Sequence, residues 1–224
     1  MTSRLAGRRV LVTSATTYMG PAIAELFTAE GADVVTDDGD LIDPAAPAAL
    51  VAATGHIDVL VANLDLPAYG ASTTDIEDDR WLAGFDAMVH PLMRLVRAVA
   101  PQMIERRAGA IVAVTSSSPL RRMSPQTISY VTARGAQNAF VRSGGHDLAR
   151  HNIRFNAIAQ NFVANDTYYP PELLANERFQ ERLAREVPAT RIGNPRETAE
   201  LALFLASETS FVFGQVISSD GGWS

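Results

Sequence analysis

Two neighbouring stretches, Val112-Ala-Val-Thr-Ser-Ser-Ser-Pro119 and Ser129-Tyr130-Val-Thr-Ala-Arg134, set a run of hydroxyl side chains directly after an apolar, β-branched run. Such a run predicts a buried strand that ends at a site. Tyr130 and Arg134 stand at positions i and i+4 of a predicted helix, which brings the phenol and the guanidinium onto one face. Ser117 lies thirteen residues before Tyr130. That is enough chain for a strand-to-helix connection to fold its hydroxyl back beside the phenol.

The composition limits the class of protein. The chain has 224 residues, of which 47% are hydrophobic, so it can bury one sizeable core, and we expect a single domain over residues 1–224. The absence of cysteine excludes disulfides and thiolate chemistry. A net charge of −6 argues against nucleic-acid and anionic-membrane partners. No apolar run approaches the roughly 20 residues of a membrane span, and the start carries no apolar signal core. We expect a soluble, cytoplasmic protein.

Predicted strands and helices alternate along the chain. Strands are expected at residues 10–12, 34–35, 57–61, 110–114, 153–158 and 215–218, and helices at 20–29, about 75–105, about 127–150, 172–186 and 195–206. A further short helix is expected to follow a loop at residues 44–47 and to run through Thr54. This alternation predicts an α/β fold of the Rossmann-like, doubly wound kind, with a parallel sheet and helices on both faces. Sites in such folds lie at the carboxyl ends of the strands.

The pattern Ser, x12, Tyr, x3, basic residue resembles the signature of the short-chain dehydrogenase/reductase superfamily, with Arg134 in place of its lysine. At the first strand-to-helix turn that superfamily carries Thr-Gly-x-x-x-Gly-x-Gly, because a pyrophosphate must approach the backbone. Here the turn reads Thr13-Ser14-Ala-Thr-Thr-Tyr18-Met-Gly20, and Tyr18 stands where the middle glycine would admit phosphate. The turn is either a diverged cofactor site that still works or a pocket filled by an aromatic side chain.

With arginine in place of the lysine and tyrosine in place of the middle glycine, the two motifs are similar to those of the halohydrin (haloalcohol) dehalogenases, a cofactor-free branch of the same superfamily. Thr13, Tyr18 and Gly20 match that family's first turn, and Ser117, Tyr130 and Arg134 match its catalytic set. The resemblance implies a lyase that converts vicinal halohydrins to epoxides and halide, and that opens epoxides with halide, azide, cyanide or nitrite. It also implies that no nicotinamide cofactor takes part and that the protein is a homotetramer.

The chemistry follows from the residue types. A phenol has an ordinary pKa of about 10, and a guanidinium within about 4–6 Å favours its phenolate form. As a base, Tyr130 would take the proton of the substrate hydroxyl while Ser117 holds that oxygen by a hydrogen bond. The alkoxide would then displace the halide from the neighbouring carbon, which closes the epoxide.

A leaving halide needs donors in a partly desolvated pocket, because an anion buried without partners is costly. The family resemblance implies that Asn161 supplies a side-chain donor, with the backbone amides of Phe162 and Val163 beside it. The full expected set for the halide or nucleophile is Thr13, Tyr18, Gly20, Asn161, Phe162, Val163, Tyr168 and Tyr169. Gln160 stands where relatives often have proline, which leaves the path of this loop open.

Several other residues have simpler interpretations. His56, His90, His146 and His151 show no metal-ligand spacing, so we expect no metal. Asp37 and Asp38 are interpreted as a solvated turn, and Met88 stands near an asparagine position of cofactor-dependent relatives. The interior helix glycines Gly144 and Gly145 suggest a close subunit contact.

Two alternatives to the dehalogenase stay open. The first is an NAD(P)-dependent oxidoreductase with an eroded glycine motif, which tight nicotinamide binding would identify. The second is a non-catalytic binding module of the same fold, without turnover and without dependence on Tyr130. The physiological substrate, its bulk and handedness, the preferred anion and the subfamily are not predicted.

Overall fold

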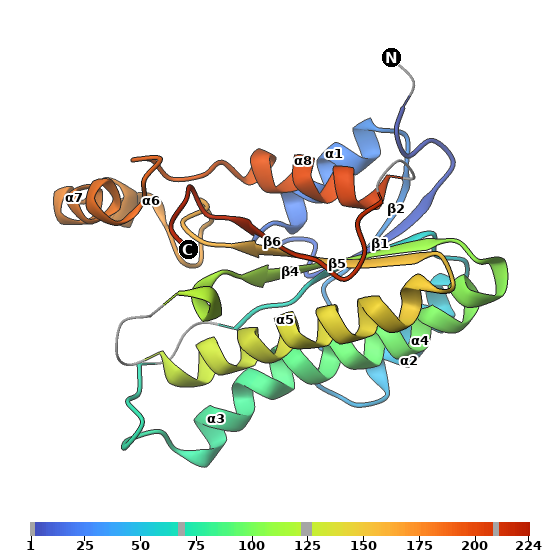
Figure 1. Ribbon diagram of the computed structural model, residues 1–224, viewed down its shortest axis with the longest axis horizontal. Helices are drawn as coiled ribbons and strands as arrows, with labels where there is room; N and C mark the ends of the chain where they lie inside the picture. Colours follow the sequence, from blue (N-terminus) through green and yellow to red (C-terminus); the bar gives the residue numbers. More distant parts are fainter. Residues whose placement is uncertain (1–2, 67–69, 122–126, 208–210) are drawn as a thin grey trace.

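The computed structural model describes residues 3–66, 70–121, 127–207 and 211–224. These residues form a six-stranded parallel sheet in the order β2-β1-β3-β4-β5-β6 (Figure 1). The strands are β1 (Arg9–Thr13), β2 (Asp33–Asp37), β3 (Val59–Asn63), β4 (Gly109–Ser116), β5 (Ile153–Gln160) and β6 (Val216–Ser219). The order reverses at β1, which pairs with β2 on one side and β3 on the other. Doubly wound sheets bind ligands at this switch point, and the predicted Rossmann-like fold is confirmed.

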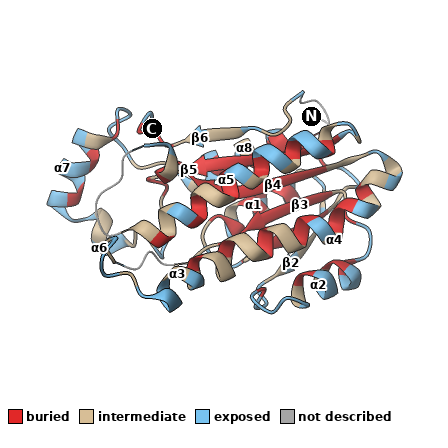
Figure 2. Ribbon diagram, turned by 60° about the horizontal axis from the view of Figure 1, so that its bottom comes forward, coloured by how far each residue is buried: buried red, intermediate tan, exposed pale blue. Residues whose placement is uncertain are grey.

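Helices cover both faces of the sheet. Helices α1 (Gly20–Ala29) and α8 (Pro195–Ala206) lie on one face, whereas α2 (Ala46–Thr54), α4 (His90–Arg106) and α5 (Ile128–Ala149) cover the other (Figure 1). Side chains of a strand alternate between the two faces. In β1, Val10 and Val12 therefore join the core under α1 and α8, while Leu11 joins the opposite core. The buried positions concentrate in the central strands (Figure 2).

The long helix expected at residues 75–105 is interrupted. It consists of α3 (Asp78–Gly84), a π-helical turn η1 (Phe85–Val89) and α4. The carbonyl oxygen of Met88, inside the π-helical turn, accepts a hydrogen bond of 2.9 Å from Nε2 of Gln137 in α5. Such turns free a backbone group for an outside partner, and here the partner holds α5 against this helix.

The helix expected at residues 172–186 is also divided. A short helix α6 (Pro171–Leu174) precedes α7 (Glu177–Glu186). Asn176 breaks the helix, because its side chain accepts hydrogen bonds from the amides of Arg178 and Phe179 and so starts a new helix. Buried Phe179 and Leu183 of α7 pack with Phe162 and Trp223 in a third, smaller core. This core attaches α7 to the loop after β5 and to the chain end.

Intrachain packing explains the two interior glycines of α5. A Cβ atom on Gly145 would lie 2.4 Å from Cα of Gly214 and 2.7 Å from the carbonyl oxygen of Phe155. A Cβ on Gly144 would lie 3.2 Å from the Phe155 ring. These glycines allow close contact with β5 and the turn before β6 within the chain, and the expected subunit contact stays a prediction. No helix of the described residues is long and apolar enough to span a membrane.

Candidate active site

The hydroxyl run lies at the carboxyl end of β4, where a short 3-10 turn η2 (Ser118–Leu120) follows the strand. Thr115 donates to the carbonyl oxygen of Ile158, and Ser116 donates to Oγ of Ser118 at 2.8 Å. Ser117 is fully buried, and its Oγ makes no hydrogen bond to any described residue. A buried hydroxyl without a partner is costly. Among the hydroxyls from Thr115 to Ser118, that of Ser117 is therefore the one available to a substrate oxygen.

Helix α5 brings Tyr130 and Arg134 together at the same edge of the sheet, as the helical spacing predicts. The guanidinium carbon of Arg134 lies 5.2 Å from the centroid of the Tyr130 ring. Arg134 is buried, with 3% of its surface exposed. Its Nη1 donates to the carbonyl oxygens of Leu64 and Val114 and to Oε1 of Gln137. This bonding holds the guanidinium beneath the phenol ring in one orientation.

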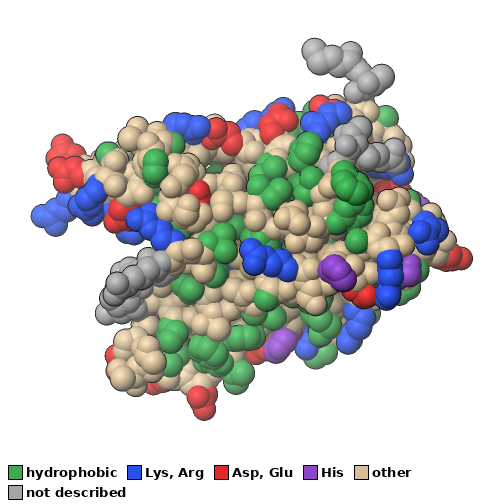
Figure 3. Space-filling view, in the orientation of Figure 1, with side chains coloured by type: hydrophobic (Ala, Val, Ile, Leu, Met, Phe, Trp, Pro, Cys, Tyr) green, Lys and Arg blue, Asp and Glu red, His purple; other side chains and the backbone are tan. Residues whose placement is uncertain are grey.

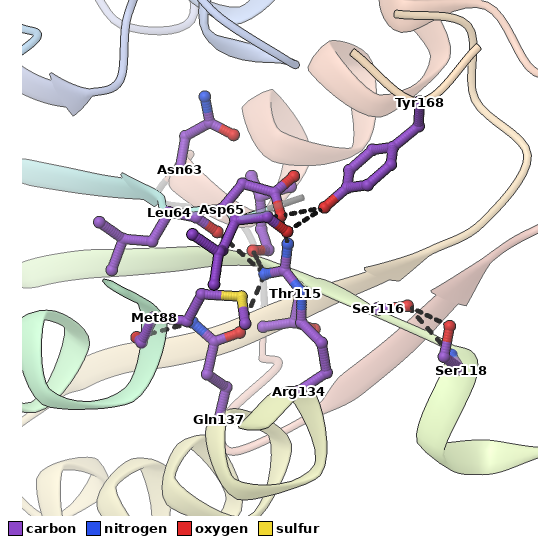
Figure 4. A network of polar contacts seen from close by, with 12 residues as sticks. Asn63, Leu64, Asp65, Met88, Thr115, Ser116, Ser118, Arg134, Gln137 and Tyr168 are labelled. Carbon is purple, nitrogen blue, oxygen red and sulfur yellow. Dashed lines mark hydrogen bonds and ion pairs between the residues drawn. The ribbon is translucent and has the colours of Figure 1, made fainter. Parts of the chain in front are cut away.

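Asp65, which the sequence analysis missed, anchors the other side of this guanidinium (Figure 4). Its Oδ1 lies 2.5 Å from Nη2 of Arg134 and accepts a 2.6 Å hydrogen bond from the hydroxyl of Tyr168. The Leu66 amide donates to the same oxygen at 2.7 Å. Asp65 follows the buried strand β3, just as the hydroxyl run follows β4. A polar residue shortly after a buried strand was therefore the sequence signal that could have indicated Asp65.

Electrostatics in this network keep the arginine charged and two phenols neutral. Burial alone would lower the pKa of Arg134, but the neighbouring Asp65 charge raises it above its ordinary value. Burial raises the pKa of Asp65, against the pull of the Arg134 guanidinium. Burial also raises the pKa of both Tyr18 and Tyr168 above that of a free phenol. Neither of these two tyrosines can therefore serve as a base at neutral pH.

Aromatic rings fill the space between the first turn and Tyr130. The ring of Tyr18 lies 5.4 Å from that of Tyr168, centroid to centroid, and Tyr168 packs edge-on against Tyr130 at 6.1 Å. Ser14 and Tyr18 adopt left-handed backbone conformations, with φ of 45° and 50°. Glycine adopts such conformations without strain. The turn therefore keeps the backbone shape of a glycine-rich turn while it carries side chains.

Thr13 and Gly20 shape this turn and offer no group to a halide. The buried hydroxyl of Thr13 accepts from the Asn63 amide at 3.1 Å, which ties β1 to β3. A Cβ on Gly20 would lie 2.3 Å from the carbonyl oxygen of Ser14, so only glycine fits there. The expected place of both residues in the halide site therefore rests on the family resemblance alone.

The first turn does not fit a dinucleotide. Asp38, expected as part of a solvated turn, accepts hydrogen bonds of 2.9 Å from both the amide and the hydroxyl of Thr16. A carboxylate thus already occupies a donor pair in the turn where Rossmann folds place pyrophosphate. Nδ2 of Asn63 donates to the carbonyl oxygens of Ser14 and Thr17, which fixes the turn. The chain also contains no lysine that could replace the one missing from the superfamily signature.

The loop after β5 brings Asn161, Phe162 and Tyr169 together. Strand β5 runs through Gln160, whose side chain accepts from Thr198 of α8, so the loop starts at Asn161. Oδ1 of Asn161 accepts from the Phe162 amide at 2.9 Å and from the Tyr169 hydroxyl at 3.1 Å. The Phe162 amide is therefore already engaged, contrary to the expected arrangement. The Asn161 side-chain nitrogen makes no hydrogen bond to another described residue and stays available as a donor.

Val163 is buried and pairs with Gly193 across a short parallel bridge. A cavity of about 880 Å³ lies beside this loop, and Asn161, Phe162, Tyr168 and Tyr169 form part of its wall. Tyr168 thus belongs both to this wall and to the network around Arg134. None of the described residues form a group of three or more His, Asp or Glu side chains that could hold a metal ion.

Comparison with known proteins gives two kinds of relative. The family model described as "Enoyl-(Acyl carrier protein) reductase" matches residues 37–224. The 3-oxoacyl-[acyl-carrier-protein] reductase FabG of Thermotoga maritima is 30% identical over 248 aligned residues, which cover 98% of each chain.

Two solved structures are close in shape. One is titled "Dehalogenation enzyme" and has a TM-score of 0.92 at 32% identity, covering 99% of this chain and 100% of its own. The other is a halohydrin dehalogenase (HheC) bound to ethyl (2S)-oxiran-2-ylacetate, with a TM-score of 0.85 at 25% identity over 96% of both chains. With a family match over most of its length and a six-stranded Rossmann-like sheet, this chain belongs to the short-chain dehydrogenase/reductase superfamily.

Proposed function

We propose that this protein is a cofactor-independent halohydrin dehalogenase. The observation that carries the proposal is the row of aromatic rings from Tyr18 through Tyr168 to Tyr130. It fills the region between the first turn and the proposed base, while the unpartnered hydroxyl of Ser117 and the buried Arg134 are retained. The proposed acid–base residues are therefore present, while aromatic side chains occupy the space that a dinucleotide would need.

In the proposed reaction, Tyr130 takes the proton from the hydroxyl of a vicinal halohydrin. The positive charge of Arg134 stabilises the resulting phenolate, and Oγ of Ser117 donates to the substrate oxygen. The alkoxide attacks the neighbouring carbon, the carbon–halogen bond breaks with its electron pair, and an epoxide and a halide ion result. In the reverse direction Tyr130 returns the proton to the epoxide oxygen while a small anion opens the ring.

The side-chain nitrogen of Asn161 is the proposed donor to the leaving halide, inside walls formed by Phe162, Tyr168 and Tyr169. The comparison structures titled as dehalogenases, at 32% and 25% identity, support the reaction class. The assignment of Asn161 rests on the family resemblance and on its free side-chain nitrogen. Val163 and Tyr18 stay in the proposed pocket on the family resemblance alone.

The test is halide release from a vicinal bromo-alcohol at neutral to mildly alkaline pH without nicotinamide. We expect release by the parent protein and none by Tyr130→Phe. Release by Tyr130→Phe at the parent rate would contradict the assignment of the base.

A second candidate function is that of an NAD(P)-dependent oxidoreductase, because one of the sequence relatives is named as a reductase. Its mark would be binding of NADPH at micromolar concentration by calorimetry, together with reduction of a ketone substrate. A non-catalytic binding module would show neither NADPH binding nor halide release.

The family resemblance also leads us to propose a homotetramer. Light scattering coupled to size-exclusion chromatography would give the mass of the assembly, and a mass of one 24.1 kDa chain would contradict it.

A further inference from the structure

The 880 Å³ cavity beside the proposed halide loop has an unusual charge for this chain. Its described lining includes three arginines, Arg121, Arg182 and Arg185, and one acidic residue, Glu186. The cavity wall is therefore positive although the whole chain carries a net charge of −6. Figure 3 shows Arg side chains gathered at the end of the molecule where α7 lies, with acidic side chains among them.

The single glutamate does not neutralise these arginines. Nε of Arg182 lies 3.2 Å from both carboxylate oxygens of Glu186, and Nη2 of Arg185 reaches one of them at 3.5 Å. Arg121, on the turn after β4, donates instead to backbone carbonyl oxygens of Trp223 and Glu186. One carboxylate is shared by two guanidinium groups, and the third pairs with no carboxylate of a described residue.

Among the three cavity arginines, Arg182 contacts the proposed halide loop through the ring of Phe162. Its guanidinium carbon lies 5.9 Å from the centroid of the Phe162 ring, which is part of the halide loop. Its two Nη groups make no hydrogen bond to any described residue, so they are free to bind an anion. Tyr168, whose ring packs against Tyr130 at 6.1 Å, and Arg182 both line this cavity. A molecule in the cavity can therefore contact both Arg182 and the aromatic neighbour of the proposed base.

Pairing within α7 alone does not account for this arrangement. Arg182 and Glu186 are spaced i, i+4, as in ordinary surface helix pairs. Arg121, however, comes from a different part of the chain, and its guanidinium carbon lies 4.9 Å from the ring centroid of Trp223, another cavity residue. Two separate segments thus supply positive charge to one cavity.

On the basis of the proposed dehalogenase, we propose that its preferred halohydrins and epoxides carry a carboxylate several bonds from the reacting carbons, bound by Arg182 with Arg121 beside it. A carboxylate accepts two parallel hydrogen bonds from one guanidinium, which gives both affinity and a fixed orientation. The reacting end of the substrate would lie at Tyr130 and the carboxylate at α7.

The test compares 8-chloro-7-hydroxyoctanoate with its neutral amide, 8-chloro-7-hydroxyoctanamide, which has nearly the same shape. Both can close to an epoxide with loss of chloride and a proton. We expect kcat/KM for the carboxylate to exceed that for the amide on the order of tenfold at low ionic strength. The ratio should fall as salt rises towards 1 M, where the Debye length is about 3 Å.

In Arg182→Gln the ratio of carboxylate to amide should approach one. Arg178→Gln is the matched control, because Arg178 lies on the same helix but does not line the cavity; it should keep the parent ratio. Equal kcat/KM for both compounds in the parent, or a preference that survives in Arg182→Gln, would overturn the proposal.

A binding measurement separates this proposal from the proposed function. 7-Hydroxyoctanoate has no halide, and its binding can be measured by calorimetry against 7-hydroxyoctanamide. If neither chlorinated compound reacts but 7-hydroxyoctanoate binds to the parent and not to Arg182→Gln, the dehalogenase fails and the carboxylate site stands. If both compounds react and 7-hydroxyoctanoate binds no better than its amide, the carboxylate site fails and the dehalogenase stands.

Discussion

Replacing Asp65 with asparagine tests the network that orients Arg134. The side chains of Arg134 and Asp65 are 3% and 7% exposed, so the pair is shielded from water. Removing one partner of such a pair leaves a buried charge and costs about 3–5 kcal/mol. The side-chain oxygen of asparagine could still accept from the three groups that now donate to Asp65 at 2.5–2.7 Å, namely Arg134, Tyr168 and the Leu66 amide, which reduces the loss. We therefore expect Asp65→Asn to lower the free energy of unfolding by about 2–4 kcal/mol.

The assay is urea unfolding at pH 7, followed by tryptophan fluorescence. Asp147→Asn is a suitable control, because Asp147 pairs with Arg150 at 2.7 Å while both side chains are more than two-thirds exposed. That variant should lose less than about 0.5 kcal/mol. If Asp65→Asn is no less stable than Asp147→Asn, Asp65 does not anchor Arg134. Halide release, measured on the folded variant, should fall as well, because Arg134 loses its fixed position under Tyr130.

Three further predictions test local conformation and charge. Ser14→Gly should raise the free energy of unfolding by about 1 kcal/mol, because glycine adopts the φ of 45° without strain; an unchanged urea midpoint would contradict this. Gly145→Ala should destabilise by more than about 2 kcal/mol through overpacking, whereas Gly135→Ala, whose Cβ would lie 3.6 Å from Pro119, should be neutral or stabilising in the same assay. Arg191 and the Asn194 amide hold the pKa of Glu197 at about 2, below its ordinary 4.5, so this stabilisation is complete above pH 4.5 and is lost as the pH falls towards 2. In a thermal scan Glu197→Gln should therefore lower the Tm by about 2–4 °C at pH 7, a value reduced to allow for the exposure of the pair, and by less at pH 3. The same difference in Tm between parent and variant at both pH values would contradict this prediction.

Features set by local periodicity could be predicted from the sequence. The i, i+4 spacing of Tyr130 and Arg134 fixes their shared face in any helix, and the alternation of strands and helices fixes the doubly wound sheet. Helix α8 (Pro195–Ala206) has the bounds expected from its cap and its apolar spacing. These predictions depend on neighbours in sequence, which the sequence displays directly.

Features set by competition between hydrogen-bond partners could not be predicted. Oδ1 of Asn161 bonds to the next amide in the chain, and the Thr13 hydroxyl bonds across to β3. Each side chain has a general capacity for hydrogen bonds, and only the folded path decides which partner uses it. Asp65 was missed for the same reason: its partners Arg134 and Tyr168 lie 69 and 103 residues away.

In the first turn, the backbone conformation and the side chains point to different origins. The backbone at Ser14 and Tyr18 stays left-handed, although each non-glycine residue there costs about 1–2 kcal/mol. Gly20 against the Ser14 carbonyl and the two hydrogen bonds from Asn63 hold that shape. Packing of Tyr18 on Tyr168 offsets part of the strain. A shape kept at this cost, but filled by an aromatic ring and Asp38, supports the proposal that this turn takes no dinucleotide.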